Sequence, residues 1–147
     1  MHVSRKADYA VRSLAYLASS PGRLVLISEL AVEAGVPKAF LSKIMKQLVG
    51  GGLVLSQKGP GGGYRLSRPA TEISFRDILL IVEGPWNLVP CQEEDGKPCS
   101  MLDNCSQVTV WNQIRSEMLE ILGSYSLEGV KCEGSASALT LPPWMKE

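Results

Sequence analysis

Two clusters of glycine divide the first half of the chain and leave only short stretches for regular structure between them. Three glycines form the first cluster at residues 50–52, and four glycines with one proline form the second at residues 59–63. Because glycine and proline interrupt regular structure more strongly than other residues, the segments 53–57 and 64–67 must be short elements. Each contains β-prone apolar residues, and two short strands around a glycine turn predict a β-hairpin.

Apolar residues before the first glycine cluster recur at steps of three and four, which is the spacing of one helix face. We expect a first helix with Ser4 as its N-cap, a second with Ser28 as its N-cap, and a third that begins at Pro37. Two short helices joined by a tight turn form the helix-turn-helix pattern, and a hairpin directly after it would be a wing. The predicted apolar side of the third helix consists of Phe40, Leu41, Ile44, Met45 and Leu48.

The second half of the chain is predicted to be helical on both sides of an irregular segment. Ser74 can cap a fourth helix, residues 86–106 carry three cysteines without a regular pattern, and a last long helix begins near Ser106. Five apolar residues of this helix are spaced three and four apart, as in the heptad seam through which two helices pair. The predicted dimerisation seam consists of Trp111, Ile114, Met118, Ile121 and Tyr125.

These elements predict a fold that is mainly α with a small β-hairpin wing. The winged helix-turn-helix occupies residues 1–68, and a helix, the cysteine loop and the long C-terminal dimerisation helix occupy residues 69–128. Residues 129–147 form a tail rich in serine, glycine and proline. Because the best apolar run has about five residues and a membrane span needs roughly 20, we expect a soluble cytoplasmic protein without membrane contact.

Charge is distributed unevenly although the whole chain sums to zero. The 147 residues carry 15 lysines and arginines and 15 aspartates and glutamates. Residues 1–68 hold ten basic and three acidic side chains, whereas residues 69–147 hold five basic and twelve acidic ones, so the halves carry +7 and −7. Such asymmetry is typical of a chain with one end that binds a polyanion, although two differently solvated surfaces would give the same numbers.

The third helix and the wing are the predicted contact surface for double-stranded DNA. The N-terminal half of a recognition helix meets base edges in the major groove, while lysines more often contact phosphates. A glycine-rich wing tip can approach a sugar-phosphate backbone closely because it has almost no side chains. A nucleotide-binding phosphate loop is excluded, since that loop needs Lys-Ser/Thr and then a helix after its glycines. The predicted DNA contacts are Lys38, Ser42, Lys43, Lys46, Lys58, Gly59, Gly61, Gly62 and Arg65.

Three of the four cysteines lie close together in the irregular segment. Cys91, Cys99 and Cys105 are separated by seven and five residues. In a cytosolic protein such clustering favours metal or redox chemistry over structural disulfides. Three thiolates on a loop bent by glycine and proline can hold an iron–sulfur cluster and leave one position for another ligand, although zinc or bare thiols also fit. Cys132, in the tail, is interpreted as a spare thiol.

Two segments of this chain resemble the Rrf2 family of bacterial winged-helix transcription regulators. They are residues 4–12, with the sequence SRKADYAVR, and residues 58–66, with the sequence KGPGGGYRL. The cysteine segment ahead of a long helix is also similar, and the resemblance covers about residues 1–128. It implies a homodimer that pairs through the long helices and presents each winged helix to half of a near-palindromic operator. We therefore expect a DNA-binding transcription regulator that acts as a repressor.

The resemblance also implies a cofactor, an iron–sulfur cluster of the 2Fe–2S or 4Fe–4S type held by three cysteines. In the branch that senses iron–sulfur status, a histidine three residues after the last cysteine completes the site, but this chain has Val108 there. In the nitric-oxide-sensing branch, an aspartate in the first helix of the other chain can complete it, and Asp8 occupies that place. Asp8 could equally pair with Arg5 or Arg12 of its own helix. The implied ligands are Cys91, Cys99, Cys105 and the partner subunit's Asp8.

Two other functions fit the same sequence. The same regulator could respond through thiol oxidation or zinc instead of a cluster, and iron content and colour would separate these cases. A winged helix can also serve only in protein–protein interaction, which a DNA affinity independent of salt would indicate. An enzyme is not expected, because the chain lacks a CxxC motif, a histidine near the cysteines and any βαβ pattern. With a cluster, we expect its oxidation, nitrosylation or loss to relax the cysteine loop and change the tilt of the two wings.

Overall fold

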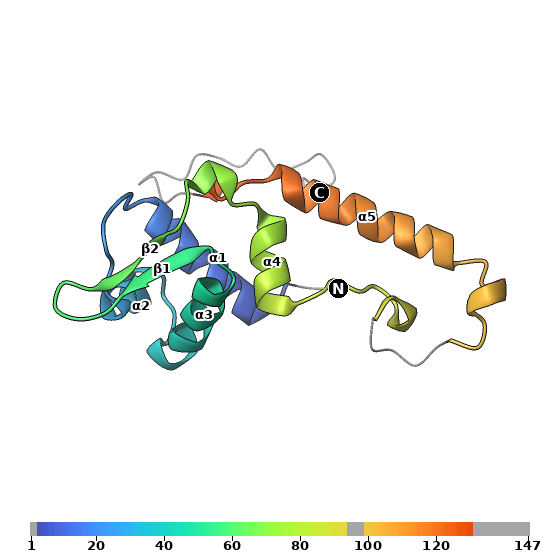
Figure 1. Cartoon of the computed structure of the whole chain (residues 1–147), viewed down its shortest axis with the longest axis horizontal. Helices are drawn as coiled ribbons and strands as arrows, with labels where there is room; N and C mark the ends of the chain where they lie inside the picture. The colour runs from blue at the N-terminus through green and yellow to red at the C-terminus, as the bar shows by residue number, and fades with distance from the viewer. Residues whose placement is uncertain (1–2, 94–98, 131–147) are drawn as a thin grey trace, which may run out of the picture.

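The computed structural model describes residues 3–93 and 99–130 of the chain. Helices and one antiparallel hairpin build the fold, so the predicted fold class is confirmed (Figure 1). The helices are α1 (Arg5–Ala18), α2 (Ile27–Glu33), α3 (Lys38–Gly50), α4 (Phe75–Glu83) and α5 (Val108–Ser124). The strands are β1 (Val54–Gln57) and β2 (Gly63–Leu66), and the 3-10 helices are η1 (Ala70–Glu72), η2 (Pro90–Gln92), η3 (Leu102–Asn104) and η4 (Leu127–Val130).

One hydrophobic core joins α1, α2, α3, the hairpin and α4. The apolar face of α1 is fully covered at Ala7, Ala10 and Leu14, because α3, α4 and η4 all pack on this helix. The helix begins where the sequence predicts, since the Ser4 side chain accepts a hydrogen bond from the Ala7 amide at 3.1 Å. Burial of the largest core side chains stabilises the fold by roughly 1.5–3 kcal/mol each.

The predicted N-cap of α2 is wrong. The helix begins at Ile27 rather than after Ser28, and its N-cap is Leu26, which makes no capping hydrogen bond through its side chain. Val25, just before the helix, forms an isolated β-bridge and is extended, and the chain enters the helix directly after Leu26. The first helical hydrogen bond runs from the Leu30 amide to the Leu26 carbonyl at 2.9 Å, and Ser28 lies exposed inside the first turn.

The hairpin forms the wing directly after α3, as the sequence predicts. β1 pairs with β2 in antiparallel register, with Val54 opposite Leu66 and Gln57 opposite Gly63. A second connection ties the wing to the segment between α1 and α2, where Val25 and Tyr64 form an isolated antiparallel bridge. The wing is therefore held from two sides, by α3 and by the α1–α2 connection.

α4 is capped as predicted and links the winged helix to the rest of the chain. The Ser74 side chain accepts from the Asp77 amide, and the Asp77 carboxylate accepts from the Ser74 amide, both at 3.1 Å, which is a capping box. The helix ends at Gly84, whose φ of 86° lies in the region that favours glycine. α4 packs on α1 and α3 on one side and on α5 on the other.

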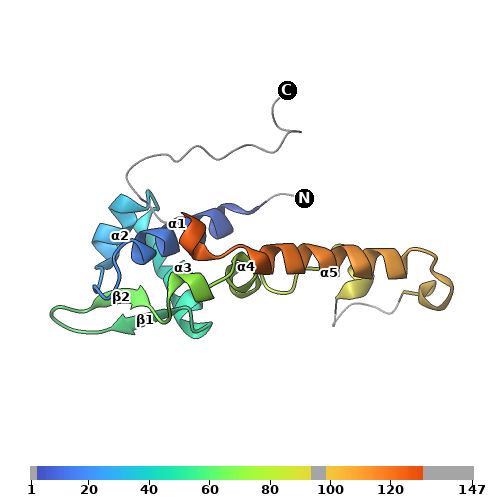
Figure 2. The same ribbon diagram turned by 90° about the horizontal axis from the view of Figure 1, so that it is seen from above.

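α5 extends away from the winged helix in both views (Figures 1 and 2). The chain then returns to the core, because Leu127 of η4 is fully buried and its amide donates to the Ile73 carbonyl at 2.8 Å. Sequence reasoning placed this stretch next to a polar tail and missed Leu127 as a core residue. Within the described ranges, the structure has no helix that combines the length and apolarity needed to cross a membrane.

Candidate nucleic-acid interface and cysteine loop

The solvent-facing side of α3 carries the four residues of this helix that the sequence predicts to contact DNA. Lys38, Ser42, Lys43 and Lys46 are all exposed, because the buried residues of α3 lie on the opposite side of the helix. The Ser42 hydroxyl donates to the Lys38 carbonyl oxygen at 3.0 Å, so it is occupied within the helix. The three ammonium groups extend from this face and are available to an anion.

Phe40 belongs to the predicted apolar side of α3, but the structure leaves it largely exposed. It is 60% exposed, whereas Leu41, Ile44 and Leu48 are buried. It lies outside the buried cluster and borders a recess that Arg5 and Lys6 of α1 also line. Its ring instead packs beside the ring of Tyr9, with 6.4 Å between centroids and 59° between planes.

The wing tip presents its two cations and two of its glycines to solvent. Lys58, Gly59, Gly61 and Arg65 are exposed. Gly62 differs, because it is buried and a Cβ atom there would lie 2.3 Å from a backbone carbonyl oxygen of β1. Gly62 therefore allows the turn to close, and the exposed glycines are those that a phosphate backbone could approach.

Ion pairs neutralise some cations of the N-terminal region and leave others without a partner. Arg12, Arg23 and Arg68 each pair with a carboxylate, at 2.8, 2.5 and 3.4 Å. Among residues 3–93 and 99–130, no ion pair or side-chain hydrogen bond engages the other basic side chains of this region. These unpaired cations are Arg5, Lys6, Lys38, Lys43, Lys46, Lys58 and Arg65. Within the described part of the N-terminal region, the unneutralised positive charge thus lies on α3, the wing and the first turn of α1.

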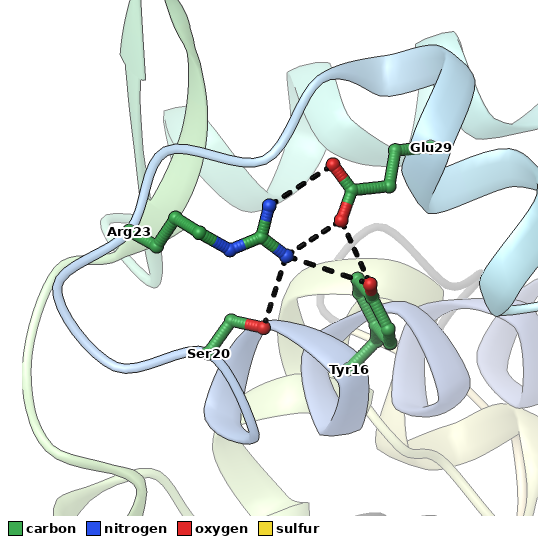
Figure 3. A network of polar contacts seen from close by, with 4 residues as sticks. All are labelled: Tyr16, Ser20, Arg23 and Glu29. Carbon is green, nitrogen blue, oxygen red and sulfur yellow. Dashed lines mark hydrogen bonds and ion pairs between the residues drawn. The ribbon is translucent and has the colours of Figure 1, made fainter.

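A polar network fixes α2 against α1 (Figure 3). Arg23 donates to both carboxylate oxygens of Glu29, at 2.5 and 3.1 Å, and the Tyr16 hydroxyl donates to the same carboxylate at 2.8 Å. Hydrogen bonds from Arg23 and then Tyr16 hold the pKa of Glu29 below its ordinary value, while the bond to Glu29 raises the pKa of Tyr16. Sequence reasoning missed this network, because Tyr16 and Glu29 are 13 positions apart and meet only in the fold.

The cysteine loop connects α4 to α5. Cys91 lies half-buried in η2, Cys99 is exposed, and Cys105 follows η3 and is half-buried. All three are free thiols. The Gln92 side chain links the start of the loop to α5, because its Nε2 amide donates to the side-chain oxygen Oδ1 of Asn112 at 3.0 Å.

The three cysteine thiols are the right kind of ligand for an iron–sulfur cluster, but the structure described for a single chain does not bring them together. Thiolates are the usual ligands of such clusters. In the part of the chain that the structure describes, no three histidine, cysteine, aspartate or glutamate side chains are grouped so that they could hold a metal ion. A cluster at these thiols therefore requires the loop to close further than it does in the chain alone. Residues 94–98 of the loop, Cys132 and the tail from residue 131 lie outside the described residues.

Asp8 lies on α1 and pairs within its own helix. Its carboxylate is 2.8 Å from the Arg12 guanidinium, and its side chain is 45% exposed. This is one of the intrachain arrangements that the sequence left open. Because the pair is exposed on both sides, it contributes little to stability and leaves the carboxylate accessible to another molecule.

α5 presents an apolar side that the described residues leave uncovered, since none of the helix's residues is buried. In the predicted seam, Ile114, Ile121 and Tyr125 are exposed by 36%, 58% and 64%, and Trp111 and Met118 are half-buried. An apolar stripe of this kind on a long helix is typical of an interface with another chain. Pairing through this seam stays a prediction.

Known proteins similar to this chain identify its family. The family model Rrf2, described as an iron-dependent transcriptional regulator, matches residues 3–133. Protein aau3 of Rhizobium meliloti (strain 1021) is 33% identical over 128 residues, which are 87% of this chain and 83% of that protein.

Two solved structures share the fold over most of their length. CymR (YrzC), described as the global cysteine regulator of B. subtilis, is 28% identical with a TM-score of 0.67, and the match covers 87% of this chain and 94% of that one. IscR of T. potens is 27% identical with a TM-score of 0.64, and the match covers 87% and 84%. The chain therefore belongs to the Rrf2 family, and it is a DNA-binding transcription regulator rather than an enzyme.

Proposed function

We propose that this regulator is a homodimeric repressor whose affinity for a near-palindromic operator is controlled by an iron–sulfur cluster at the cysteine loop. The DNA part of this proposal rests on one observation. Some basic side chains of the N-terminal region pair with carboxylates, and the others, among the described residues, do not. Arg12, Arg23 and Arg68 are neutralised, whereas the described parts of α3, the wing and the first turn of α1 keep their cations unpaired. Lysines and arginines that neutralise phosphates supply much of the affinity for DNA.

The dimeric part of the proposal is supported by α5. A two-fold dimer uses the same apolar patch on both chains, and the exposed Ile114, Ile121 and Tyr125 provide such a patch. Two winged helices related by a two-fold axis read two inverted half-sites, about one helical turn or a multiple of it apart.

The sensing part of the proposal is supported by the position of the cysteine loop. The loop joins the ends of α4 and α5, and α4 packs directly on α1 and α3. A change in the shape of the loop therefore reaches both the DNA surface and the predicted dimer helix. Cys91, Cys99 and Cys105 would hold the cluster, with the partner subunit's Asp8 as a fourth ligand. A bound cluster would supply a centre that reacts with oxidants and nitric oxide.

The cluster is tested by anaerobic purification with iron and acid-labile sulfide counted per chain. We expect about two or four irons and as many sulfides, and we expect Cys91→Ala, Cys99→Ala and Cys105→Ala each to lose most of them. Cys132→Ala is the matched control and should keep the full content. Zinc in place of iron, or a full cluster in Cys99→Ala, would contradict the proposal.

Thiol oxidation is a second candidate, favoured by the exposure of Cys99 and the open arrangement of the three thiols. Hydrogen peroxide would oxidise two thiols to one disulfide, and the two electrons and two protons removed would convert the peroxide to two waters. In metal-free protein, a change in DNA affinity that dithiothreitol reverses and that Cys99→Ala abolishes would favour this candidate over the cluster.

DNA recognition is tested by selecting duplexes from a randomised library with the purified protein. We expect the enriched duplexes to share an inverted repeat, and we expect their affinity to fall steeply as salt is raised. Lys43→Gln should weaken binding, whereas Val32→Ala, at an exposed residue of α2, should not. Failure to enrich any duplex would contradict the DNA surface proposed for α3 and the wing.

A further inference from the structure

We propose that Phe40 reads a thymine in each half of the operator by packing its ring on the 5-methyl group of that base. This inference rests on the proposed DNA surface of α3. In the major groove, the thymine methyl is the apolar group on the edges of the base pairs, and apolar side chains recognise it by contact. Phe40 is the large apolar side chain that α3 leaves exposed.

The first observation is that the core does not use Phe40. It is 60% exposed, whereas the next apolar residues of α3, Leu41 and Ile44, are 0% and 2% exposed. The exposed part of the ring gains nothing from the hydrophobic effect in the chain alone, so it contributes only when another molecule covers it.

The second observation is the position of Phe40 in the helix. α3 begins at Lys38, so Phe40 is its third residue, and its amide donates to the Pro37 carbonyl at 3.0 Å in the first turn. Side chains at the N-terminal end of a recognition helix are those that reach base edges. Lys43, one turn further on, lies on the same side of the helix and stays unpaired among the described residues.

The third observation is that the ring is held in place before any DNA arrives. Tyr9 packs beside Phe40 at a tilt of 59°, within the range of favourable aromatic pairs. A prearranged ring loses little rotational freedom when it contacts a base. Tyr9 is thus a positioning residue for Phe40, although it need not touch DNA itself.

The fourth observation is the chemistry around the ring. Phe40 borders a recess of about 410 Å³ between α1 and α3. Its apolar lining includes Tyr9 and Ile44, and its cationic lining is Arg5, Lys6 and Lys43. An apolar surface bordered by unpaired cations complements a nucleotide in a duplex, where the methyl and sugar are apolar and the phosphate is anionic.

The experiment replaces each thymine of a selected duplex, one base pair at a time, with deoxyuridine, which removes only the 5-methyl group. For the natural chain we expect binding to weaken about fourfold at one thymine in each half-site, which is the order expected for one buried methyl group. At the other thymines we expect no change. Binding is measured by fluorescence anisotropy at one fixed salt concentration.

Protein variants connect this effect to Phe40. In Phe40→Ala the two duplexes, with thymine and with uracil, should bind equally, while Val32→Ala should keep the fourfold difference. Tyr9→Ala should reduce the difference in affinity between the thymine and uracil duplexes, and Tyr9→Phe, which keeps the ring, should preserve it. If Tyr9 only stabilised the fold, its loss would weaken binding to both duplexes equally and leave the difference unchanged. Circular dichroism and thermal unfolding show whether each variant is folded, and Phe40→Leu, which retains an apolar contact, is the fallback.

Two failures are distinguishable. If no duplex is enriched from the library, the proposed DNA surface fails. If a duplex is enriched and bound, but no uracil substitution weakens the natural chain, or Phe40→Ala keeps the difference between thymine and uracil, then α3 binds DNA and the role of Phe40 is wrong.

Discussion

The backbones of Val25 and Tyr64 exchange two hydrogen bonds of 2.9 Å, one in each direction. This bridge joins the segment between α1 and α2 to the second strand of the wing, about 40 positions later in the chain. It fixes the wing relative to the helix-turn-helix independently of the turn that follows α3. The angle between α3 and the wing, on which simultaneous contact with DNA depends, is therefore set in part by a residue outside both elements.

The first prediction concerns Gly63, which makes this bridge possible. A Cβ atom at Gly63 would lie 2.6 Å from the Val25 carbonyl oxygen, and its φ is 150°. Gly63→Ala should lower the free energy of unfolding by about 2 kcal/mol, because the bridge must open or the backbone must strain. Gly50→Ala, with open space around it in α3, should be neutral or slightly stabilising. Urea unfolding measures both, and equal losses would contradict the argument.

Much of the fold could be predicted because local patterns determine it. The glycine clusters set the limits of α3 and of the hairpin, and the caps at Ser4 and Ser74 lie where the sequence places them. Polar residues on the outer face of α3 were also predictable, since the periodicity of its apolar residues leaves them no other position.

The remaining features depend on contacts between distant segments, which periodicity does not reveal. Phe40 follows the apolar pattern of α3, yet it is 60% exposed although Tyr9 of α1 packs beside its ring. Leu127 has no periodic neighbours, yet η4 returns it to the core beside Ile73. Similarly, cysteine spacing alone cannot show whether one chain gathers the three thiols, and the described residues do not.

The second prediction compares a true helix cap with an apparent one. Ser74 accepts a hydrogen bond in the capping box of α4, whereas Ser28 is exposed inside α2 and makes no side-chain hydrogen bond among the described residues. Ser74→Ala should lower the free energy of unfolding by about 1 kcal/mol, and Ser28→Ala by less than about 0.5 kcal/mol. Chemical denaturation of both variants checks this difference, and a larger loss for Ser28→Ala would refute the assigned start of α2.

The third prediction is a dependence of stability on acid pH through Glu29. Hydrogen bonds from Arg23 and Tyr16 lower its folded pKa below the unfolded value. The stability from this shift is therefore fully present above the unfolded pKa, near 4.3, and is lost as the pH falls through the folded pKa. Denaturation at pH 6 and at pH 3 should show a larger loss for the natural chain than for Glu29→Gln. Glu33→Gln, on the same helix, should follow the natural chain, and identical losses in all three proteins would exclude this role for Glu29.

The fourth prediction uses salt to identify phosphate contacts in the first turn of α1. Arg5 and Lys6 are unpaired among the described residues, whereas Arg12 is held by Asp8 at 2.8 Å. Arg5→Gln and Lys6→Gln should each reduce the slope of log affinity against log salt by roughly 0.9, the value for one phosphate contact. Arg12→Gln should change it less. Titrations of one selected duplex between about 50 and 200 mM salt provide the slopes. If all three variants keep the natural slope, α1 lies away from the phosphates.

The last prediction concerns the apolar side of α5. Ile121 is 58% exposed, so Ile121→Asp should leave the fold of a single chain intact. In a two-fold dimer the same substitution occurs on both chains, and each loses roughly 1.5–3 kcal/mol of apolar burial. Dissociation should therefore become at least about 100-fold easier, which sedimentation equilibrium measures directly. Val32→Asp, at a residue of α2 that is 77% exposed, introduces the same charge outside the seam and should leave the association unchanged.

Because two linked winged helices hold an inverted repeat far more tightly than one, Ile121→Asp should also weaken binding to the full operator while leaving binding to a single half-site unchanged. An Ile121→Asp protein that stays dimeric would place the subunit contact elsewhere on the chain.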